Sequence, residues 1–291
     1  MDILSQYLSA KRDLINQALD QCLPPATAEP RIIHECMRYS VQDGKRLRPT
    51  IVLAVAETLA CPVERALPTA VAVELIHTHS LILDDLPGMD NDDCRRGRPA
   101  THDRFGEGIA LLAADALLNL AIVLLGANHR LIGLPAETAL DIIREVGENV
   151  GTNGMIGGQV ADLTFSPAVD GASMLERIHL RKTANLFRLS ARAASLVAGA
   201  TEHQLAALSS YAENLGLAYQ IIDDILDHAK SGNPIKGRPR AGPNFATAYG
   251  IPRAHALAEQ LTREALRALS GFDATAETLR SLAKANLLRP A

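Results

Sequence analysis

The sequence predicts an all-α fold in a single domain over residues 1–291, and three observations lead to this prediction. Hydrophobic residues make up 47% of the chain and aromatic residues only 3%, so Leu, Ala, Ile and Val must fill the core. Leu and Ala have high helix propensity, and long runs rich in them favour helices over strands. No strand pair, internal repeat or interdomain linker stands out, so one large helical domain is the simplest architecture.

Pro and Gly residues separate the expected helices. The spacing of Leu4, Leu8, Ile15 and Leu19 predicts an amphipathic first helix that ends before Pro24. Further helices are expected at residues 31–42, 49–60, 67–86, 109–127, 136–151, 172–200, 202–230, 252–269 and 274–288, with a glycine-rich break at 154–158 and a loop at 231–242.

Composition also excludes several classes of protein. Segment 109–127 is apolar enough to suggest a membrane span, but Asp115 and Asn119 lie inside it, and polar groups are costly in lipid. We therefore expect a buried core helix there and no membrane span. The net charge of −4 argues against a nucleic-acid partner. The four cysteines lack C-x-x-C spacing and the N-terminal region lacks a signal-peptide layout, so we expect reduced thiols and a cytoplasmic location.

Two acidic clusters follow apolar runs. They are Asp84-Asp85-Leu-Pro-Gly-Met-Asp90 and Asp223-Asp224-Ile-Leu-Asp227. Asp223 and Asp227 are four residues apart and share one helix face, where like charges repel without a counterion. Pro87-Gly88 interrupts the first cluster, so a loop can fold Asp90 back beside Asp84. One such cluster could equally be a solvated helix end, but two favour a site for Mg²⁺, which prefers oxygen ligands.

Cationic residues that suit an anionic ligand accompany the acids. They are Lys45, Arg46, Arg48, Arg95, Arg96 and Lys182. Arginine binds phosphate oxygens bidentately and lysine acts as a point charge. Taken alone, the segment 45–48 would be a basic turn at a helix start. Together with the acids, the cations predict one diphosphate held by metals and another held by cations alone.

These residues lie in motifs that resemble those of the trans-isoprenyl diphosphate synthases. The motifs are the first aspartate-rich run at 75–97, G-K-R-L-R-P at 44–49, G-Q-V-A-D-L at 158–163, Lys182-Thr183, and G-L-A-Y-Q-I-I-D-D-I-L-D at 216–227. The resemblance spans about residues 40–230. It implies a bundle of antiparallel helices around a central cavity, in a homodimer.

The implied reaction is the head-to-tail condensation of an allylic diphosphate with isopentenyl diphosphate by a prenyltransferase that uses three Mg²⁺ ions. The residue roles carried over are Asp84, Asp90, Asp223 and Asp227 as metal ligands; Asp85 and Asp224 as catalytic carboxylates; Arg95, Lys182 and Lys236 at the allylic diphosphate; Lys45, Arg48, His77 and Arg96 at isopentenyl diphosphate; and Thr183 and Gln220 beside the allylic cation. Gln159 and Asp162 are expected to support these groups.

Product length is expected to depend on the residues upstream of Asp84. Ser80 lies one helical turn before Asp84 on the same face, with His79 beside it. Farnesyl-producing relatives often have an aromatic residue at the position of His79, and geranylgeranyl-producing relatives usually have a smaller one. Histidine is intermediate, so a C15–C20 product is expected and both lengths stay open.

The resemblance weakens after Asp227. If Thr247 is the threonine of the family's K-x-T-Y-P motif, Phe245 replaces its lysine. Lys236 stands for the first lysine of the loop, and Arg238 or Arg240 could substitute for the second. Loss of one charge-assisted hydrogen bond costs on the order of 1.5–3 kcal/mol.

Two other functions are consistent with parts of the sequence. A class I terpene cyclase would use similar ionisation chemistry, but it generally carries N-x-x-x-S-x-x-x-E where this chain has 223–227, and it needs no second diphosphate site. A catalytically silent subunit that regulates an active synthase is favoured only by the altered loop at 231–245. The acids retained in both clusters argue against it.

Overall fold

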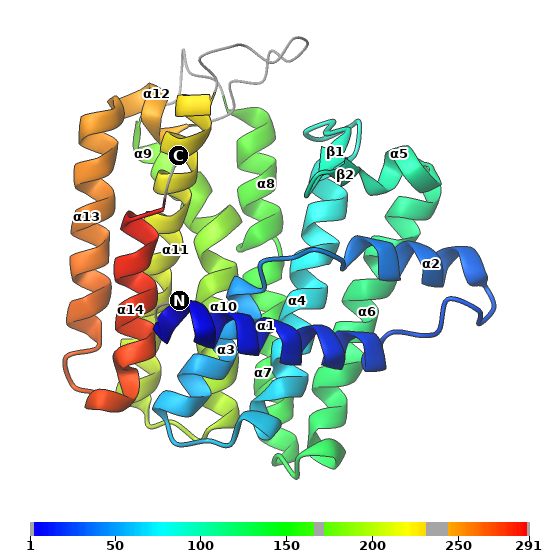
Figure 1. Ribbon diagram of the computed structural model, residues 1–291, viewed down its shortest axis with the longest axis horizontal. Coiled ribbons are helices and arrows are strands. Elements are labelled where there is room, and N and C mark those ends of the chain that lie inside the picture. The colour runs from blue at the N-terminus through cyan, green and yellow to red at the C-terminus, as the bar shows by residue number, and fades with distance from the viewer. Residues whose placement is uncertain (1–2, 166–171, 231–243, 290–291) are drawn as a thin grey trace. The chain divides into compact units, whose positions relative to one another are not determined.

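The structure, a computed structural model, describes residues 3–165, 172–230 and 244–289 (Figure 1). The chain groups into two compact units, one of Met1–Leu53 with Cys61–Ile143 and the other of Ala54–Ala60 with Arg144–Ala291. Helices dominate both, and within the described ranges the strands are limited to one two-residue pair. The all-α prediction is confirmed, and the single domain over 1–291 stays a prediction.

The first unit is built around two long helices that pack along each other. Its elements are α1 (Ile3–Cys22), α2 (Arg31–Ser40), the first part of α3 (Leu47–Thr58), α4 (Val63–Asp85), β1 (Cys94–Arg95), β2 (Arg98–Pro99), α5 (Thr101–Phe105), α6 (Glu107–Leu131) and the first part of α7 (Ala136–Val150). The face of α6 that packs on α4 is rich in alanine, including Ala110, Ala114 and Ala121. These small side chains recur every three or four residues and let the two helices approach closely.

The opposite face of α6 corrects the prediction of a buried core helix at 109–127. Only 33% of the most apolar stretch of α6 is buried, against 67% for α4, although both helices are long and apolar enough to cross a membrane. Leu111, Leu112, Ile122 and Val123 are all exposed. None of the described residues covers this apolar face, so its apolar residues cannot be explained by packing within the chain.

A small β-hairpin also departs from the prediction that no strands pair. β1 and β2 are antiparallel, with Cys94 opposite Pro99 and Arg95 opposite Arg98. The two residues between them, Arg96 and Gly97, have φ of 54° and 76°. Two positive φ values give the turn that matches the twist of a two-residue hairpin, and glycine adopts one of them without strain. Strands of two residues carry no alternating pattern, which is why the sequence did not reveal them.

The second unit is a set of helices around α11, which packs along α10 and α13 (Figure 1). Its elements are the rest of α3 and α7, α8 (Met155–Thr164), α9 (Ala172–His179), the π-helix η1 (Leu180–Ala184), α10 (Asn185–Val197), α11 (Glu202–Lys230), α12 (Phe245–Tyr249), α13 (Ile251–Ala268), the short 3₁₀-helix η2 (Ala274–Ala276) and α14 (Glu277–Leu287). Ile221, Ile222, Leu226 and Phe245 lie in one buried cluster with residues of α9 and α13.

Two expectations about this unit need correction. The segment 172–200 is not one α-helix, because η1 interrupts it. The predicted glycine-rich break is partly right, since the chain breaks between α7 and α8 and Gly154 directly precedes α8, but Gly157 and Gly158 lie inside α8. A Cβ on Gly158 would lie 2.4 Å from the backbone nitrogen of Lys182. Glycine is therefore required where α8 meets the backbone of η1, and it marks a close contact rather than a turn.

Candidate active site

The first acidic cluster lies where α4 ends and the chain turns back. Leu86 takes an extended conformation with ψ of 150°, as expected for a residue before proline. The amide of Asp90 then donates a 2.8 Å hydrogen bond to the carbonyl of Asp84, and the amide of Asp92 donates one of 3.1 Å to the carbonyl of Asp85. The prediction that the Pro87-Gly88 loop folds Asp90 back beside Asp84 is confirmed.

The second aspartate of this cluster is paired with the arginine of the hairpin. The Arg95 Nε lies 3.0 and 3.1 Å from the two carboxylate oxygens of Asp85, its Nη2 also contacts Asp85, and Nη2 lies 3.0 Å from Asp92. Burial alone would lower the pKa of Arg95, but the hydrogen bonds and negative charges of these acids raise it above the ordinary arginine value. Asp85 therefore holds Arg95 in place and is not open to solvent.

A buried ion pair lies beneath the basic motif. Arg46, only 4% exposed, donates through Nη1 to Glu74 of α4 at 2.5 Å and through Nε to Asn16 at 2.8 Å. Arg96 Nη2 lies 3.9 Å from the same Glu74 carboxylate, and Arg96 Nη1 donates to the carbonyl of Gln42 at 2.8 Å. Arg46, the first of the two arginines in the G-K-R-L-R-P motif, thus supports the fold, and Glu74 links it to Arg96.

The outer cations of that motif are placed differently. Lys45 is exposed to solvent, and the Nη1 of Arg48 lies 3.1 Å from the Nε2 of His77 on α4. Burial lowers the pKa of His77 well below its ordinary value, and nearby arginines, Arg48 foremost, lower it further. The ring is therefore neutral, and since guanidinium can only donate, its proton lies on Nδ1. That buried Nδ1 has no partner among the described residues, so it can donate to a bound acceptor.

The two residues predicted to affect product length are both buried. His79 is 4% exposed, and its Nδ1 lies 3.0 Å from the carbonyl oxygen of Ala114 on α6. Burial lowers the pKa of His79 below its ordinary value, and the contact with Ala114 offsets part of this. Ser80 donates its hydroxyl to the carbonyl of His77 at 2.8 Å. His79 thus lies against α6, and Ser80 lies on the face of α4 that leads to Asp84.

The second acidic cluster lies on the continuous helix α11. Asp223 is half-buried and Asp227 is exposed, as the shared helix face predicts. Asp224 is 6% exposed and points inward. Burial raises the pKa of Asp224 to about 6, and the charges of Asp223 and Asp227 act in the same direction, while hydrogen bonds from Phe245 and Gln220 lower it by less.

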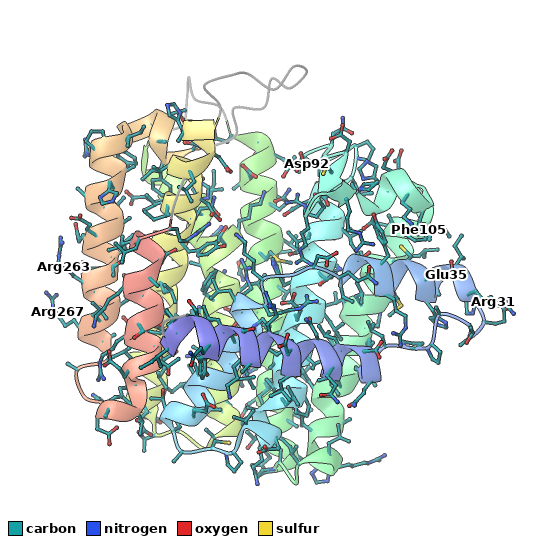
Figure 2. All side chains as sticks on the ribbon, in the orientation of Figure 1. Arg31, Glu35, Asp92, Phe105, Arg263 and Arg267 are labelled. Carbon is teal, nitrogen blue, oxygen red and sulfur yellow. The ribbon has the colours of Figure 1, made fainter. Side chains whose placement is uncertain are left out.

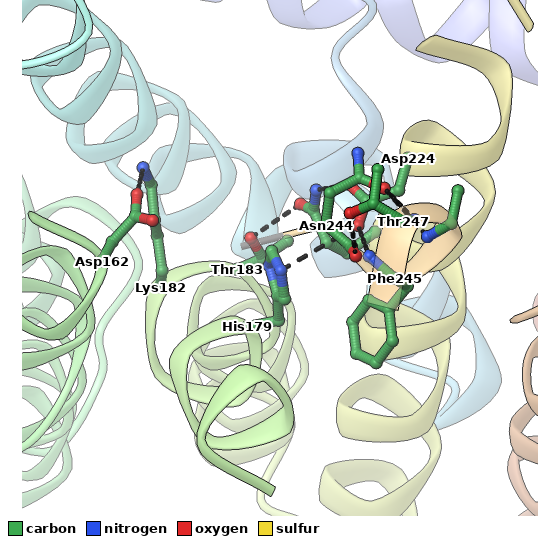
Figure 3. A network of polar contacts seen from close by, with 10 residues as sticks. Asp162, His179, Lys182, Thr183, Asp224, Asn244, Phe245 and Thr247 are labelled. Carbon is green, nitrogen blue, oxygen red and sulfur yellow. Dashed lines mark hydrogen bonds and ion pairs between the residues drawn. The ribbon is translucent and has the colours of Figure 1, made fainter. Parts of the chain in front are cut away.

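A chain of hydrogen bonds connects Asp224 to the π-helix (Figure 3). The hydroxyl of Thr183 donates to Gln220 Oε1 at 2.9 Å, and Gln220 Nε2 donates to Asp224 Oδ1 at 2.8 Å. The amide of Phe245 donates to Asp224 Oδ2 at 2.7 Å, and the Nε2 of His179 lies 4.0 Å from the same oxygen. Thr183 of the Lys182-Thr183 motif therefore forms one network with Gln220 and Asp224 of the motif at 216–227.

Lys182, the neighbour of Thr183 in η1, faces a different helix. Its Nζ donates to Asp162 Oδ2 on α8 at 2.6 Å, and both side chains are about four-fifths buried (Figure 3). Asp162 was expected to support the site, and it does so by holding the lysine. The π-helix, a feature often found at functional sites, thus places adjacent residues against α8 and α11.

Phe245, at the position compared with a lysine of the family's K-x-T-Y-P motif, is buried in the core of this unit. Its ring is 1% exposed, 5.0 Å from the ring of His179, and belongs to the buried cluster of this unit. Asn244 caps α12 by accepting from the amides of Ala246 and Thr247 at 2.8 and 3.1 Å. The position compared with a family lysine is therefore a core position in this chain. Lys236, Arg238 and Arg240 lie outside the described residues.

Arg289 is a contact of the second cluster that the sequence did not suggest. Its Nη2 donates to Asp223 Oδ1, so a cation already lies at a predicted metal ligand. Within the described ranges no three His, Cys, Asp or Glu side chains converge as a ready metal site. Mg²⁺ usually takes one or two carboxylates and completes its shell with water and substrate phosphates, so the aspartates present fit the ion without such a cluster.

Counting Arg289, sequence reasoning missed four site-supporting features, and their signals differ in strength. Glu74 is the one acid inside the apolar run 70–76 of α4, and such an acid needs a buried partner, so the pair with Arg46 could have been predicted. His179 and Arg289 carry no local pattern. The π-helix also leaves no mark in a search for period 3.6.

Comparison with known proteins identifies the family of this chain. A family model described as polyprenyl synthetase matches residues 30–277. The large subunit 1 of the heterodimeric geranylgeranyl pyrophosphate synthase of Arabidopsis thaliana is 40% identical over 277 residues, covering 92% of this chain and 74% of that protein. The geranylfarnesyl diphosphate synthase of Leucosceptrum canum is 41% identical over 278 residues, covering 92% and 75%.

Solved structures give the same result. An FPP/GFPP synthase from Zymomonas mobilis aligns with a TM-score of 0.87 and 32% identity over 98% of both chains. A geranyltransferase from Legionella pneumophila aligns with a TM-score of 0.88 and 29% identity, covering 99% of this chain and 98% of its own. The chain therefore belongs to the polyprenyl synthetase family, that of the trans-isoprenyl diphosphate synthases.

Proposed function

We propose that this prenyltransferase, a short-chain prenyl diphosphate synthase, condenses isopentenyl diphosphate head-to-tail with an allylic diphosphate in a Mg²⁺-dependent reaction that yields a linear C15–C20 diphosphate. The observation that carries the proposal is the return loop of the first cluster, where Asp90 is bonded back to Asp84. Directly after it, the hairpin presents Arg95 and Arg96. Acids and cations in this order suit a metal-bound diphosphate beside a second anion.

The carboxylates of Asp84, Asp90, Asp223 and Asp227 would hold the ions, three in number by the family pattern. When bound, Mg²⁺ neutralises the diphosphate oxygens and makes diphosphate a better leaving group. Asp85 would keep Arg95 oriented toward that diphosphate, since both of its carboxylate oxygens accept hydrogen bonds from the guanidinium. Lys182 would exchange its hydrogen bond to Asp162 for one to a diphosphate oxygen.

Thr183 and Gln220 would stabilise the allylic cation left by departure of diphosphate. The Thr183 hydroxyl donates to Gln220, so its oxygen lone pairs remain available to a positive charge. Such fixed dipoles stabilise a developing charge without reorganisation. The double bond of isopentenyl diphosphate attacks this cation, and the proton then lost can pass to the departed diphosphate, so no side-chain base is required.

Isopentenyl diphosphate would bind at Lys45, Arg48, His77 and Arg96. Arg48 holds the neutral His77 with its Nδ1–H unpartnered among the described residues, which gives a donor for a phosphate oxygen. Lys45 is exposed and can reach a ligand as a point charge. This set of cations and one neutral donor would bind diphosphate without a metal.

The proposal includes a homodimer with a cytoplasmic location. The exposed apolar face of α6 around Leu112 and Val123 supports a second copy as its cover, since large uncovered apolar patches mark interaction sites. Four free cysteines are compatible with a reducing compartment. Light scattering with Leu112→Glu and Val123→Glu checks the first point, because a charge on this face should give monomers.

The direct test is an assay with labelled isopentenyl diphosphate, each of dimethylallyl, geranyl and farnesyl diphosphate, and Mg²⁺ or chelator, with products separated by length. We expect linear C15 or C20 diphosphate, lost with chelator and reduced at least a thousandfold in Asp84→Ala and Asp223→Ala. Cyclic hydrocarbons would indicate a cyclase. A folded protein that incorporates nothing would support the silent subunit, for which the buried Phe245 is the one structural argument.

A further inference from the structure

Arg289 occupies a position from which it can control the second acidic cluster. It lies just after α14, near the end of the described chain, and its Nη2 donates to Asp223 Oδ1 on α11. Its guanidinium carbon also lies 4.3 Å from the centre of the Tyr219 ring, one helical turn before Asp223. Both charged side chains are mostly shielded from water, with exposed fractions of 22% for Arg289 and 33% for Asp223.

The guanidinium is only partly satisfied in this place. Its Nη1 is buried and has no hydrogen-bond partner among the described residues. A buried donor without an acceptor is unfavourable, and a cation over an aromatic ring offsets only part of that cost. The contact therefore depends mainly on the charge of Asp223. A cation that binds Asp223 more strongly would therefore displace Arg289 from this carboxylate.

Asp223 needs a cation in the absence of metal. Asp227 is on the same helix face and Asp224 is the next residue, so three carboxylates lie within one turn and a half of α11. Like charges at this spacing repel, and the repulsion is offset by Arg289 in the structure. The guanidinium and a metal ion cannot both hold the same Oδ1, since each would lie at bonding distance from it and two cations that close repel.

We propose that Arg289 is an internal cation that competes with Mg²⁺ for Asp223: it neutralises the second cluster while the site is empty and is displaced when metal and diphosphate bind. The inference rests on the proposed role of Asp223 as a metal ligand. Its chemistry is ion exchange at one carboxylate, and no covalent step is involved. The consequence is that the wild-type chain takes up metal less readily than its aspartates alone would.

The test uses the full chain with inorganic diphosphate as the probe and titrates Mg²⁺ by calorimetry. We expect Arg289→Gln to lower the Mg²⁺ concentration at half-saturation about three- to tenfold, and Arg289→Lys, which keeps the charge, to lower it less. Arg263→Gln is the matched control, since Arg263 is an exposed arginine of α13 whose partner Glu259 lies 3.8 Å away (Figure 2). It removes the same charge and should leave the titration unchanged.

A thermal readout separates this role from mere support of the C-terminal region. Without metal, Arg289→Gln should melt below the wild type, because the carboxylates are left uncompensated. With Mg²⁺ and diphosphate the difference should vanish. An equal loss of melting temperature in both states, or unchanged or weaker Mg²⁺ binding by Arg289→Gln, would overturn the proposal.

Asp223→Ala distinguishes failure of this inference from failure of the proposed function. If Asp223→Ala removes Mg²⁺-diphosphate binding while Arg289→Gln changes nothing, Asp223 is a metal ligand and only the competition is wrong. If Asp223→Ala binds as the wild type does, the metal role of Asp223 is wrong and the inference fails with it. Tighter binding in Arg289→Gln, lost again in the double variant with Asp223→Ala, supports both.

Discussion

Asp85 and Asp224 occupy the same place in the two acidic clusters, as the second of two adjacent aspartates, and both are buried, with exposed fractions of 1% and 6%. Around Asp85 the partner is a cation, because Arg95 donates to both of its oxygens. Around Asp224 the donors are neutral, an amide nitrogen of Gln220 and the backbone amide of Phe245. The same dipeptide is therefore buried against opposite kinds of donor.

The difference shows that two buried aspartates at the same position of a motif can be stabilised by opposite kinds of donor. Neutral donors offset only part of the free energy lost when a carboxylate leaves water, so the pKa of Asp224 rises to about 6. A guanidinium provides a full opposite charge with a bidentate geometry. In the first cluster the buried Asp85 thus holds Arg95, as Glu74 holds Arg46 farther up α4, whereas in the second cluster the buried Asp224 anchors a chain of uncharged hydrogen-bond donors.

The largest effect is expected where a buried acid and an arginine are both fully shielded from water. Glu74→Gln tests this case, because it removes the counterion of the buried Arg46. We expect the free energy of unfolding to fall by about 3–5 kcal/mol, because a buried charge is left without its counterion. Urea denaturation measures it. Glu64→Gln, at an exposed position in the first turn of the same helix, is the control and should change stability by less than about 0.5 kcal/mol. A loss of similar size in both variants would contradict the role of the buried pair.

Asp85→Asn should give the next largest effect. Arg95 loses its main counterion but keeps Asp92 and is about one-third exposed, so we expect a loss of about 2 kcal/mol in the free energy of unfolding. The same denaturation experiment measures it, with Asp103→Asn, an exposed aspartate of α5, as the control. Wild-type stability in Asp85→Asn would show that Arg95 does not depend on Asp85.

Asp224→Asn, unlike Asp85→Asn, should change the free energy of unfolding little. The new side-chain NH₂ can donate to Gln220 if that amide turns over, and Thr183 can then accept from Gln220, because a hydroxyl can do either. Every polar group in the network keeps a partner. We therefore expect Asp224→Asn without metal at pH 7.5 to be at least as stable as the wild type.

The smallest and most specific effect is the pH dependence of the difference in stability between the wild type and Asp224→Asn. The unfolded carboxyl releases its proton near 3.8 and the folded one near 6, so between these values the folded chain holds more protons and loses stability as pH rises. Only the wild type responds, since asparagine does not titrate. The stability advantage of Asp224→Asn should therefore shrink by about 1 kcal/mol from pH 7.5 to pH 5 in the presence of chelator. A constant difference across this range would show that Asp224 is not protonated there.

Much of the fold and site could be predicted from local pattern. Pro87-Gly88 predicted the return of Asp90, and the 3.6-residue period predicted the shared face of Asp223 and Asp227 on one continuous helix. These predictions succeeded because each depends on residues close in sequence or on a strong family pattern.

What could not be predicted depends on contacts between distant segments. Arg289 reaches Asp223 from 66 residues away, and nothing near either residue indicates the other. The exposure of α6 was missed because its two faces are both apolar, so periodicity could not tell the packed face from the open one. The motif comparison predicted that Phe245 replaces a lysine, but its burial beside Ile221 and Leu226 could be seen only in the structure.

The π-helix η1 has a consequence for changes in chain length. A π turn holds one residue more than an α turn of the same height, so Leu180–Ala184 contains a residue that an uninterrupted helix would not accommodate. Deleting one residue there would restore an α turn and leave the helix downstream facing the same way, because the wider turn is what absorbs the extra residue. Deleting one residue within α10 would instead rotate the residues that follow by about 100°, and buried residues such as Ala194 would turn away from α11. The extra residue of η1 is therefore not needed for the packing of α10, and its effect is confined to the turn that carries Lys182 and Thr183.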